Sequence, residues 1–301
     1  MPTKVPAAKK TTTKLPRAYD AEYLALQEIA VELRELVVDM LLEAGSGHSA
    51  GSLGTADIFA SLYFNVLNID PKNPLDPDRD RFVLSNGHIC PIWYATLYKR
   101  GFFAKEQLWT LRKLNSQLQG HPHYNPSLGI QNTAGPLGQG LSQAIGMAMA
   151  AKMDGKNHRI YCMTGDGELN EGQIWEAALL APKYRLNNLV WIIDRNNIQL
   201  DGYTEDIMPL ESLRNKLEAF NWFTIEIDGH NIEEIVNACS MAKAVTQRPT
   251  AIVAHTIPGK GVNFMENKPE WHGKSPNKEE AKIALRQLHT LGGRLKDHEI
   301  L

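Results

Sequence analysis

Apolar residues recur at steps of three and four between residues 20 and 45, and this spacing predicts a long helix with one buried stripe. Asp20 stands where an N-cap residue would begin that helix, and Gly45 and Gly47 would end it. A nearly all-apolar stretch over residues 55–67 predicts a second helix that is well buried. The chain is therefore expected to open with helices rather than strands.

Further along, short apolar runs alternate with helical patterns. The predicted strands lie within residues 82–88, 159–164, 189–194, 222–228 and 250–256, and the predicted helices cover residues 141–151, 174–181, 209–220 and 231–245. Pro182 falls inside a helical pattern and should end or kink that helix. Strands that alternate with helices indicate an α/β fold with an open, mostly parallel sheet and helices on both faces.

Composition limits the classes of partner and compartment. The 301 residues are 43% hydrophobic with a net charge of -2, which disfavours nucleic acid or an anionic membrane as a partner. We expect one domain over residues 20–301 behind a flexible basic tail at residues 1–19. No apolar run is long enough to span a membrane. The three cysteines are odd in number and form no CxxC pair, which favours the reducing cytoplasm.

Polar side chains follow two consecutive predicted strands. Asp166 comes just after the strand at 159–164, and Asp194, Asn196 and Asn197 come at the end of the next strand. Ligands of open parallel sheets bind beyond the carboxyl ends of the strands, so neighbouring strands would bring these loops together. Hard oxygen ligands suit Mg²⁺ or Ca²⁺, and Mg²⁺ often adds phosphate oxygens. Asp-Gly and Asn-Asn are ordinary turn sequences when taken alone, but the matched positions predict a clamp for Mg²⁺ and a diphosphate.

Four histidines lie beside glycine in loops rather than on a helical stripe. They are His48, His88, His121 and His272. One histidine in a loop is more often incidental than catalytic. Four in such settings indicate a polar cluster that exchanges protons near neutral pH.

Longer blocks of sequence add a family resemblance. GDG followed about thirty residues later by Asn resembles the thiamine diphosphate signature, and the surrounding blocks resemble transketolase. These blocks are SGHSAGSLG (46–54), DRFVLSNGH (80–88), QGHP (119–122), TAGPLGQGLSQAIGMA (133–148), GDGELNEGQIWEAALLA (165–181), NLVWIIDRNNIQLDG (188–202) and WHG (271–273). They follow the family's order but match only its first domain. The chain thus resembles the N-terminal subunit of a split transketolase, with the family's diphosphate-domain fold.

The resemblance implies a set of cofactor-binding residues. It implies that Mg²⁺, or Ca²⁺ or Mn²⁺ in its place, binds Asp166, the Asn196 side chain and the Ile198 carbonyl. The cofactor-binding residues that the resemblance implies are His88, Gly135, Pro136, Leu137, Asp166, Gly167, Asn196 and His272.

The resemblance also assigns catalytic roles. His48, His121 and His272 would surround a sugar substrate, with His48 and His272 as candidates for proton transfer and His121 bonded to the two-carbon fragment. That fragment would pass from a ketose or ketose phosphate to an aldose or aldose phosphate. Glu171 would lie at the dimer interface between two cofactors, and its position also suits a first-turn glutamate favoured by the helix dipole.

Some family features are absent from the chain. The glutamate that activates the aminopyrimidine belongs to the family's next domain, as do most residues that grip a sugar phosphate. We therefore expect the chain alone to be inactive and to need a separate C-terminal subunit in an α2β2 assembly. HSAGSLG replaces the family's usual HPGAPLG. HYNPSLGIQ, which follows QGHP, differs from the family's usual sequence at that place, so the sequence does not determine the sugar substrate.

Three alternatives remain beside the leading interpretation. The chain could belong to another thiamine diphosphate enzyme, such as one resembling deoxyxylulose-phosphate synthase or one acting on a specialised sugar. It could be a non-catalytic regulatory subunit that keeps the fold. A nicotinamide-binding fold is a poor candidate, because no G-x-G-x-x-G follows the first predicted strand.

Overall fold

The computed structural model describes residues 18–291. The strands are β1 (Arg81–Leu84), β2 (Ile160–Gly165), β3 (Leu189–Arg195), β4 (Ile198–Gln199), β5 (Gly202–Tyr203), β6 (Phe223–Asp228) and β7 (Thr250–His255). The α-helices are α1 (Ala18–Ala44), α2 (Ala50–Gly54), α3 (Ala56–Ser61), α4 (Cys90–Arg100), α5 (Gly140–Met153), α6 (Gly172–Lys183), α7 (Thr204–Ile207), α8 (Leu213–Ala219), α9 (Ile232–Ala244) and α10 (Lys278–Leu291). Short turns of other helix types are η1 (Leu62–Val66), η2 (Gly87–Ile89), η3 (Lys105–Thr110), η4 (Pro126–Leu128), η5 (Gly167–Asn170) and η6 (Pro269–Trp271).

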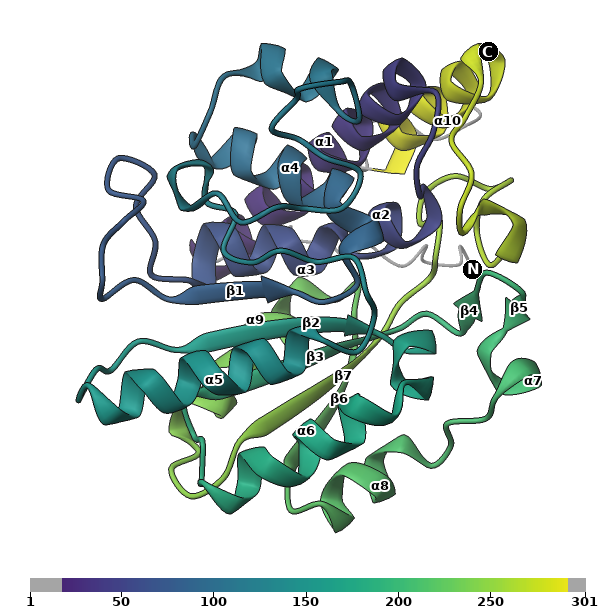
Figure 1. The fold of residues 1–301 in the computed structure, drawn as a ribbon. Helices are drawn as coiled ribbons and strands as arrows, with labels where there is room; N and C mark the ends of the chain where they lie inside the picture. Colours follow the sequence, from purple (N-terminus) through teal and green to yellow (C-terminus); the bar gives the residue numbers. More distant parts are fainter. Residues whose placement is uncertain (1–17, 292–301) are drawn as a thin grey trace, which may run out of the picture.

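Five strands form one parallel sheet in the order β1-β2-β3-β7-β6 (Figure 1). The predicted α/β fold with a parallel sheet is confirmed. β2 and β3 are neighbours, and Gly165 pairs with Asp194 at their carboxyl ends. The two polar loops that follow these strands therefore start side by side, as the sequence predicts.

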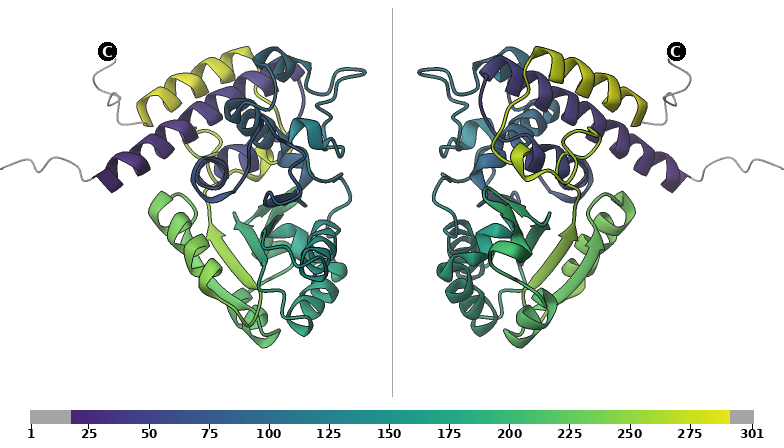
Figure 2. Two further views of the ribbon diagram at one scale, coloured as in Figure 1. Left: turned by 90° about the vertical axis from the view of Figure 1, so that its left-hand side faces the viewer. Right: turned by 90° about the vertical axis from the view of Figure 1, so that its right-hand side faces the viewer.

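Alternate residues of each strand pack against opposite layers of helices. Tyr161 and Met163 join the core with α1, α3, α4 and α9, while Ile160 and Cys162 join the core with α5, α6 and α8. Figure 2 shows α1 and α10 side by side on the outside of the first layer. Helices thus cover both faces, which explains why the central strands β2 and β3 are buried at every residue, whereas the edge strand β6 alternates with polar residues. Cys90, Cys162 and Cys239 are buried free thiols.

Pro182 lies in the last turn of α6, which ends one residue later at Lys183, close to where the sequence predicts the end. A proline has no N–H, so the carbonyl of Ala178 loses its usual partner four residues ahead. The indole Nε1 of Trp222 donates to that carbonyl at 2.9 Å. Because Trp222 is fully buried, this bond satisfies an acceptor that water cannot reach.

The first helices differ from the prediction at their ends. α1 begins at Ala18, so Asp20 lies inside its first turn and does not cap it. Residues 1–17 of the predicted tail are outside the described part. An apolar stripe fixes which face of a helix is buried but not where the helix starts, and Ala18 and Tyr19 are not helix breakers.

The predicted helix over 55–67 is present as α3 followed directly by the π-helical turn η1, and the short α2, which was not predicted, precedes it and is separated from it at Thr55. α2 approaches the backbone of residues 257–258 so closely that a Cβ on Gly54 would lie 3.0 Å from the Ile257 carbonyl oxygen. That long-range contact cannot be read from local periodicity. α4 was not predicted, because it is buried over most of its length and shows no amphipathic stripe.

In the described residues, no helix is both long and apolar enough to cross a membrane.

The N-terminus of α5 begins with a glycine that packs against Ser85, directly after β1. The Gly140 N–H donates to Ser85 Oγ at 2.9 Å, and a Cβ on Gly140 would lie 2.7 Å from the Ser85 Cα. We predict that Gly140→Ala lowers the free energy of unfolding by about 1–3 kcal/mol, because helix and strand must separate. Gly146→Ala on the same helix meets no atom within 4 Å and should be neutral or stabilising by up to about 1 kcal/mol. Urea unfolding of the isolated chain measures both, and equal losses would show that the close approach to β1 is not the cause.

Candidate active site

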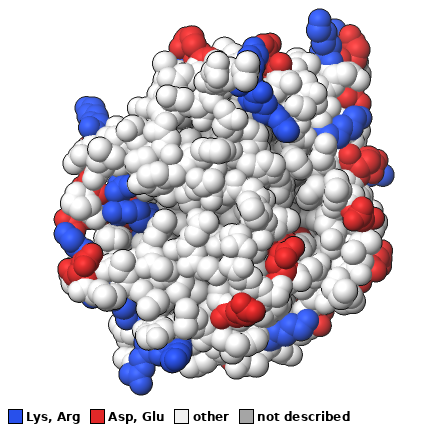
Figure 3. All heavy atoms as spheres, in the orientation of Figure 1, with Lys and Arg blue, Asp and Glu red and all other residues white. Residues whose placement is uncertain are grey.

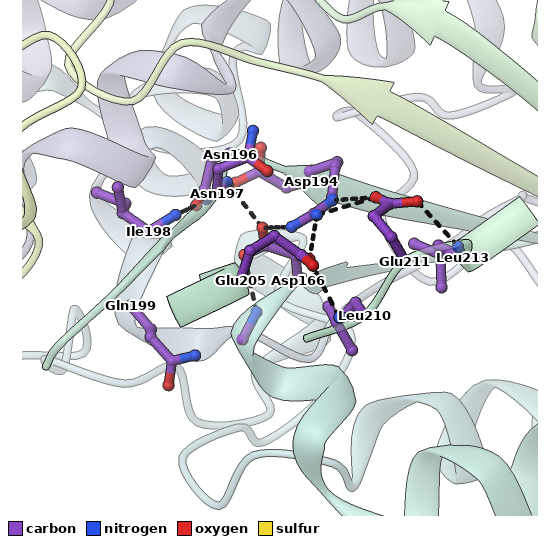
Figure 4. A network of polar contacts seen from close by, with 12 residues as sticks. Asp166, Asp194, Asn196, Asn197, Ile198, Gln199, Glu205, Leu210, Glu211 and Leu213 are labelled. Carbon is purple, nitrogen blue, oxygen red and sulfur yellow. Dashed lines mark hydrogen bonds and ion pairs between the residues drawn. The ribbon is translucent and has the colours of Figure 1, made fainter. Parts of the chain in front are cut away.

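Asp166 follows β2 directly and is almost fully buried. Its Oδ1 accepts from the Gly167 N–H at 2.7 Å, and its Oδ2 accepts from the Asn197 N–H at 2.7 Å and from Arg195 at 2.8 Å. Burial raises the pKa of Asp166, and the bonds from Arg195 oppose that rise. The structure thus holds this carboxylate in one orientation between the β2 and β3 loops (Figure 4).

Arg195 balances the charge of this corner. Its buried guanidinium pairs with Asp166 and reaches Glu205 at 2.5 Å and Glu211 at 2.9 Å. Arg195 was not predicted as a site residue. The sequence shows only that Arg195 follows Asp194 in a polar segment. It does not show that the Arg195 side chain contacts Asp166. The Arg195–Asp166 pair joins the β2 and β3 loops and gives the buried Asp166 carboxylate a counter-charge.

Asp194 orients the amide of Asn196. Asn196 donates from Nδ2 to Asp194 at 2.7 Å, and its Oδ1 accepts from the Ile198 N–H at 3.0 Å. Asp194 also accepts from Thr256 at 2.5 Å, and burial raises the pKa of Asp194 to about 7. With the nitrogen engaged by Asp194, the amide oxygen of Asn196 is presented on the other side, toward Ile198 in the β4–β5 hairpin.

The buried carboxylate of Glu168 joins three loops that the sequence did not connect. Its Oε1 accepts from the Gly138 N–H at 2.8 Å and from Ser85 Oγ, and its Oε2 accepts from the Gly165 N–H at 3.2 Å. Burial raises the pKa of Glu168 to about 7, and these three bonds oppose the rise. Glu168 was missed because GDGELNEG marks the loop after β2 without showing which acid turns inward.

Three of the four predicted histidines come together. The ring centroids of His48 and His88 are 4.9 Å apart, those of His88 and His272 are 5.1 Å apart, and those of His48 and His272 are 5.7 Å apart. A Cβ on Gly273 would lie 3.7 Å from His48 Nε2 and 3.5 Å from Leu200 in the β4–β5 hairpin. The histidine cluster therefore adjoins the loop that carries Asn196 and Ile198.

Burial keeps these histidines neutral. It is the largest cause that lowers the pKa of His48 to about 4, followed by the charges of His272, His121 and Arg112. Burial also lowers the pKa of His88 and of His272. His48 Nδ1 is buried and has no hydrogen-bond partner among the described residues. A neutral ring with an unpaired nitrogen can accept a proton or bind a polar ligand atom.

His121 stands at the exposed edge of the cluster. Its Cβ is 4.0 Å from the position of a Cβ on Gly135, so it borders the loop that includes Pro136 and Leu137. Pro136 and Leu137 are exposed, and Leu137 keeps 37% of its surface. Burial, followed by the charge of Arg112, lowers the pKa of His121.

Glu171 directly precedes α6, at the N-cap position and not in the first turn of the helix. Its side chain is exposed, and a Cβ on Gly138 would lie 2.8 Å from its Cβ. Gly138 has φ of 82°, so a side chain there would be strained as well as crowded. The structure thus brings Glu171 beside the 135–138 loop, on the surface.

Comparison with known proteins identifies relatives of the chain. Residues 25–292 match the family model of the transketolase thiamine diphosphate binding domain. A subunit of a 6-deoxy-6-sulfo-D-fructose transketolase from Clostridium sp. (strain MSTE9) is 44% identical over 271 residues, which cover 90% of this chain and 98% of that subunit. A subunit of an apulose-4-phosphate transketolase from Phocaeicola vulgatus is 40% identical over 255 residues, which cover 85% of this chain and 90% of that subunit.

Full-length transketolases match over part of their length. Human transketolase is 40% identical over 268 residues, which are 88% of this chain and 42% of that protein. The crystal structure of transketolase from Campylobacter jejuni superposes with a TM-score of 0.83 at 38% identity and covers 87% of this chain and 42% of its own. Sequence and structure agree along nearly the whole chain, which therefore belongs to the transketolase family as an N-terminal subunit with the thiamine diphosphate-binding fold.

Proposed function

We propose that the chain is the cofactor-binding subunit of a transketolase that moves a two-carbon ketol unit from a ketose to an aldose, with a separate C-terminal subunit. The observation that carries this proposal is the convergence of neutral histidines with the Asp166 and Asn196 loops at one edge of the sheet. The relatives named as transketolase subunits support it.

The oxygen atoms of this edge fit Mg²⁺. Asp166 Oδ1 and Asn196 Oδ1 each accept one hydrogen bond among the described residues, which leaves each oxygen a lone pair. With the carbonyl of Ile198, they form a set of hard ligands that phosphate oxygens and water would complete. No group of three His, Cys, Asp or Glu side chains within residues 18–291 is placed to hold a metal, so the proposed ion would depend on phosphate oxygens and water beside these three oxygens.

The cofactor would lie along the loops that Glu168 joins. Gly167 would meet the diphosphate through its backbone, with His88 and His272 beside it, and the loop of Gly135, Pro136 and Leu137 would lie near the aminopyrimidine. A bound thiamine diphosphate supplies an electron sink for breaking a carbon–carbon bond next to a carbonyl. The chain's own task is to hold the reactants and to move protons.

Neutral histidines suit that task. His48 and His272 can take the proton of a sugar hydroxyl at pH 7, because the pKa of each is lowered and the rings stay uncharged. His121, at the exposed edge, would donate to the transferred fragment. Burial around the rings also excludes water that would compete for the proton.

The names of the relatives suggest which class of sugar is the donor. Their names refer to a sulfonated ketose and to apulose-4-phosphate, and we propose that the donor here is likewise a specialised ketose. An enzyme acting on another ketol remains the alternative within the family. A regulatory role is the alternative outside catalysis.

A partner is proposed because the chain spans only 42% of human transketolase. The outward positions of α5 are exposed and uncharged at Gln143, Gly146 and Ala150. Figure 3 shows a face of the molecule whose centre carries few charged side chains, with most Lys, Arg, Asp and Glu near its edges. A surface of this kind suits a large, permanent interface. We propose an α2β2 assembly in which Glu171 lies between the two cofactor sites.

The cluster makes stability depend on pH. The pKa of His48 is 6.5 in an ordinary setting and about 4 here, so the unfolded chain binds a proton between those values and the folded chain does not. Stability should therefore fall as the pH is lowered from 6.5 to 4. The stability of His48→Gln should fall less steeply than that of the wild-type chain over this range, as measured by urea unfolding at a series of pH values. His255→Gln, at the exposed end of β7, is the matched control. If the stability of His48→Gln falls with pH as steeply as that of the wild type, His48 is not a neutral, buried side chain.

The proposed activity is tested on the complex recovered with the tagged chain from its native lysate. We expect a stoichiometric second polypeptide and ketol transfer that requires thiamine diphosphate and Mg²⁺. A lone chain without transfer would contradict the proposal.

In that complex, Asp166→Ala should reduce turnover by more than about 100-fold, because a metal ligand is lost. Thiamine diphosphate with Mg²⁺ should raise the melting temperature of the wild-type complex but not that of the variant. Asp201→Ala, an exposed acid in the turn between β4 and β5, is the control and should behave as wild type. Unchanged turnover in Asp166→Ala would favour the regulatory alternative.

A further inference from the structure

The guanidinium of Arg112 lies between the two loops that carry His48 and His121. A Cβ on Gly120 would be 3.0 Å from Nε and 3.1 Å from Cζ of Arg112, and a Cβ on Gly47 would be 3.5 Å from its Nη1. Gly47 directly precedes His48, and Gly120 directly precedes His121. The two Gly-His pairs thus flank one cation, and the lack of side chains at both glycines makes room for it.

The backbone around Arg112 is held in place. Arg112 has φ of 62°, a left-handed conformation that is uncommon for residues other than glycine, and its N–H donates to the Leu118 carbonyl at 2.9 Å. The hydroxyl of Tyr94 donates to the Gln119 carbonyl at 2.9 Å, and the thiol of Cys90 contacts the Gly120 carbonyl at 3.3 Å. A sparsely populated conformation fixed by such contacts is typical of functional sites.

The charge of Arg112 is not neutralised by any of the described residues. Its side chain is exposed, and among residues 18–291 its guanidinium has no hydrogen-bond or ion-pair partner. The neighbouring Lys113 pairs with Glu43 at 2.5 Å. Arg112 also acts on the site, because its charge contributes to lowering the pKa of His48 and of His121.

The cations at the opposite end of β1 and β2 differ in this respect. A cavity of about 520 Å³ at the opposite end of β1 and β2 is also lined by charged residues. There Lys156 pairs with Asp78 at 2.8 Å, and Arg159 donates to the carbonyls of Asn187 and Lys243. Those charges are already engaged, whereas Arg112 has no such partner within the described residues.

We propose that Arg112 binds an anionic group, phosphate or sulfonate, of the sugar substrate, and so selects charged sugars. This inference rests on the proposed function and extends it. A guanidinium presents a planar fork of N–H donors that matches the oxygens of either anion. The family resemblance assigns most of the residues that bind a sugar phosphate to the family's other domains, and Arg112 adds a contact from this chain.

The test compares Arg112→Gln, Arg112→Lys and Lys113→Gln in the complex recovered with the tagged chain. Each is assayed for kcat/KM with three classes of ketose donor: phosphorylated, sulfonated and uncharged. For Arg112→Gln we expect a loss of at least about tenfold with the charged donors and less than about twofold with the uncharged donor, because one charge-assisted contact is removed. Arg112→Lys keeps a charge without the fork and should be intermediate, and Lys113→Gln should match wild type.

The donor classes separate the sources of the anion. A loss with one charged class only identifies phosphate or sulfonate as the natural group. An equal loss with charged and uncharged donors would overturn the proposal, since Arg112 would then act on the histidines and not on the substrate charge. No loss with any donor would overturn it as well.

A second measurement does not depend on turnover. Inorganic phosphate and methanesulfonate are titrated separately into the full-length wild-type and Arg112→Gln chains, and the imidazole C–H proton resonances of His48 and His121 are followed. We expect saturable shifts in the wild type with at least one anion and their loss in the variant. If the complex transfers no ketol but these shifts occur and depend on Arg112, the proposed activity fails and the anion site stands. Identical titrations of the two proteins would overturn the site.

Discussion

The buried carboxylate of Glu168 is the constraint on which the site depends. It accepts hydrogen bonds from the end of β1, the end of β2 and the loop before α5, and so fixes three segments that lie far apart in the sequence. An acid in this position must be fully bonded, because a buried polar group without partners costs about 1–3 kcal/mol. The loops are therefore held together before any ligand arrives. Such preorganisation lowers the entropy that binding would otherwise lose.

A second buried network organises the end of β3. Arg195 connects Asp166 with Glu205 and Glu211, while Asp194 turns the amide of Asn196. Together these contacts place a carboxylate oxygen and an amide oxygen at the same edge. On the other side of this edge, burial keeps the histidines uncharged. This edge thus combines fixed oxygen atoms with neutral imidazoles, which is the combination that the proposed proton transfer near Mg²⁺ would require.

The surface around this edge is consistent with half of a larger site. His121, Leu137 and Glu171 are exposed, although the family resemblance implies a role for each of them at the substrate, the cofactor or the interface. Full-length relatives continue well beyond the part that this chain matches. Arg112 is exposed at the same edge, where its charge would attract the anionic group of the proposed sugar substrate.

The sequence by itself determined the fold class, the neighbouring loops after β2 and β3, and the residue types of the site. Hydrophobic periodicity reports which faces are buried, and the rule that ligands bind at the carboxyl ends of parallel strands turns that pattern into a location. It also singled out His48, His88 and His272, because histidines beside glycines in loops are unusual when they recur.

Only the tertiary structure decided which of the acids turn inward and which cation near the histidines lacks a partner. Glu168 and Arg195 act on partners that are far away in the chain or across a turn, and α2 is shaped by contact with residues 257–258. In the sequence Arg112 is one of many basic residues, and only the structure shows that Gly47 and Gly120 flank its guanidinium. Local patterns carry no information about such distant neighbours, because burial and charge pairing are set by the packing of the whole chain.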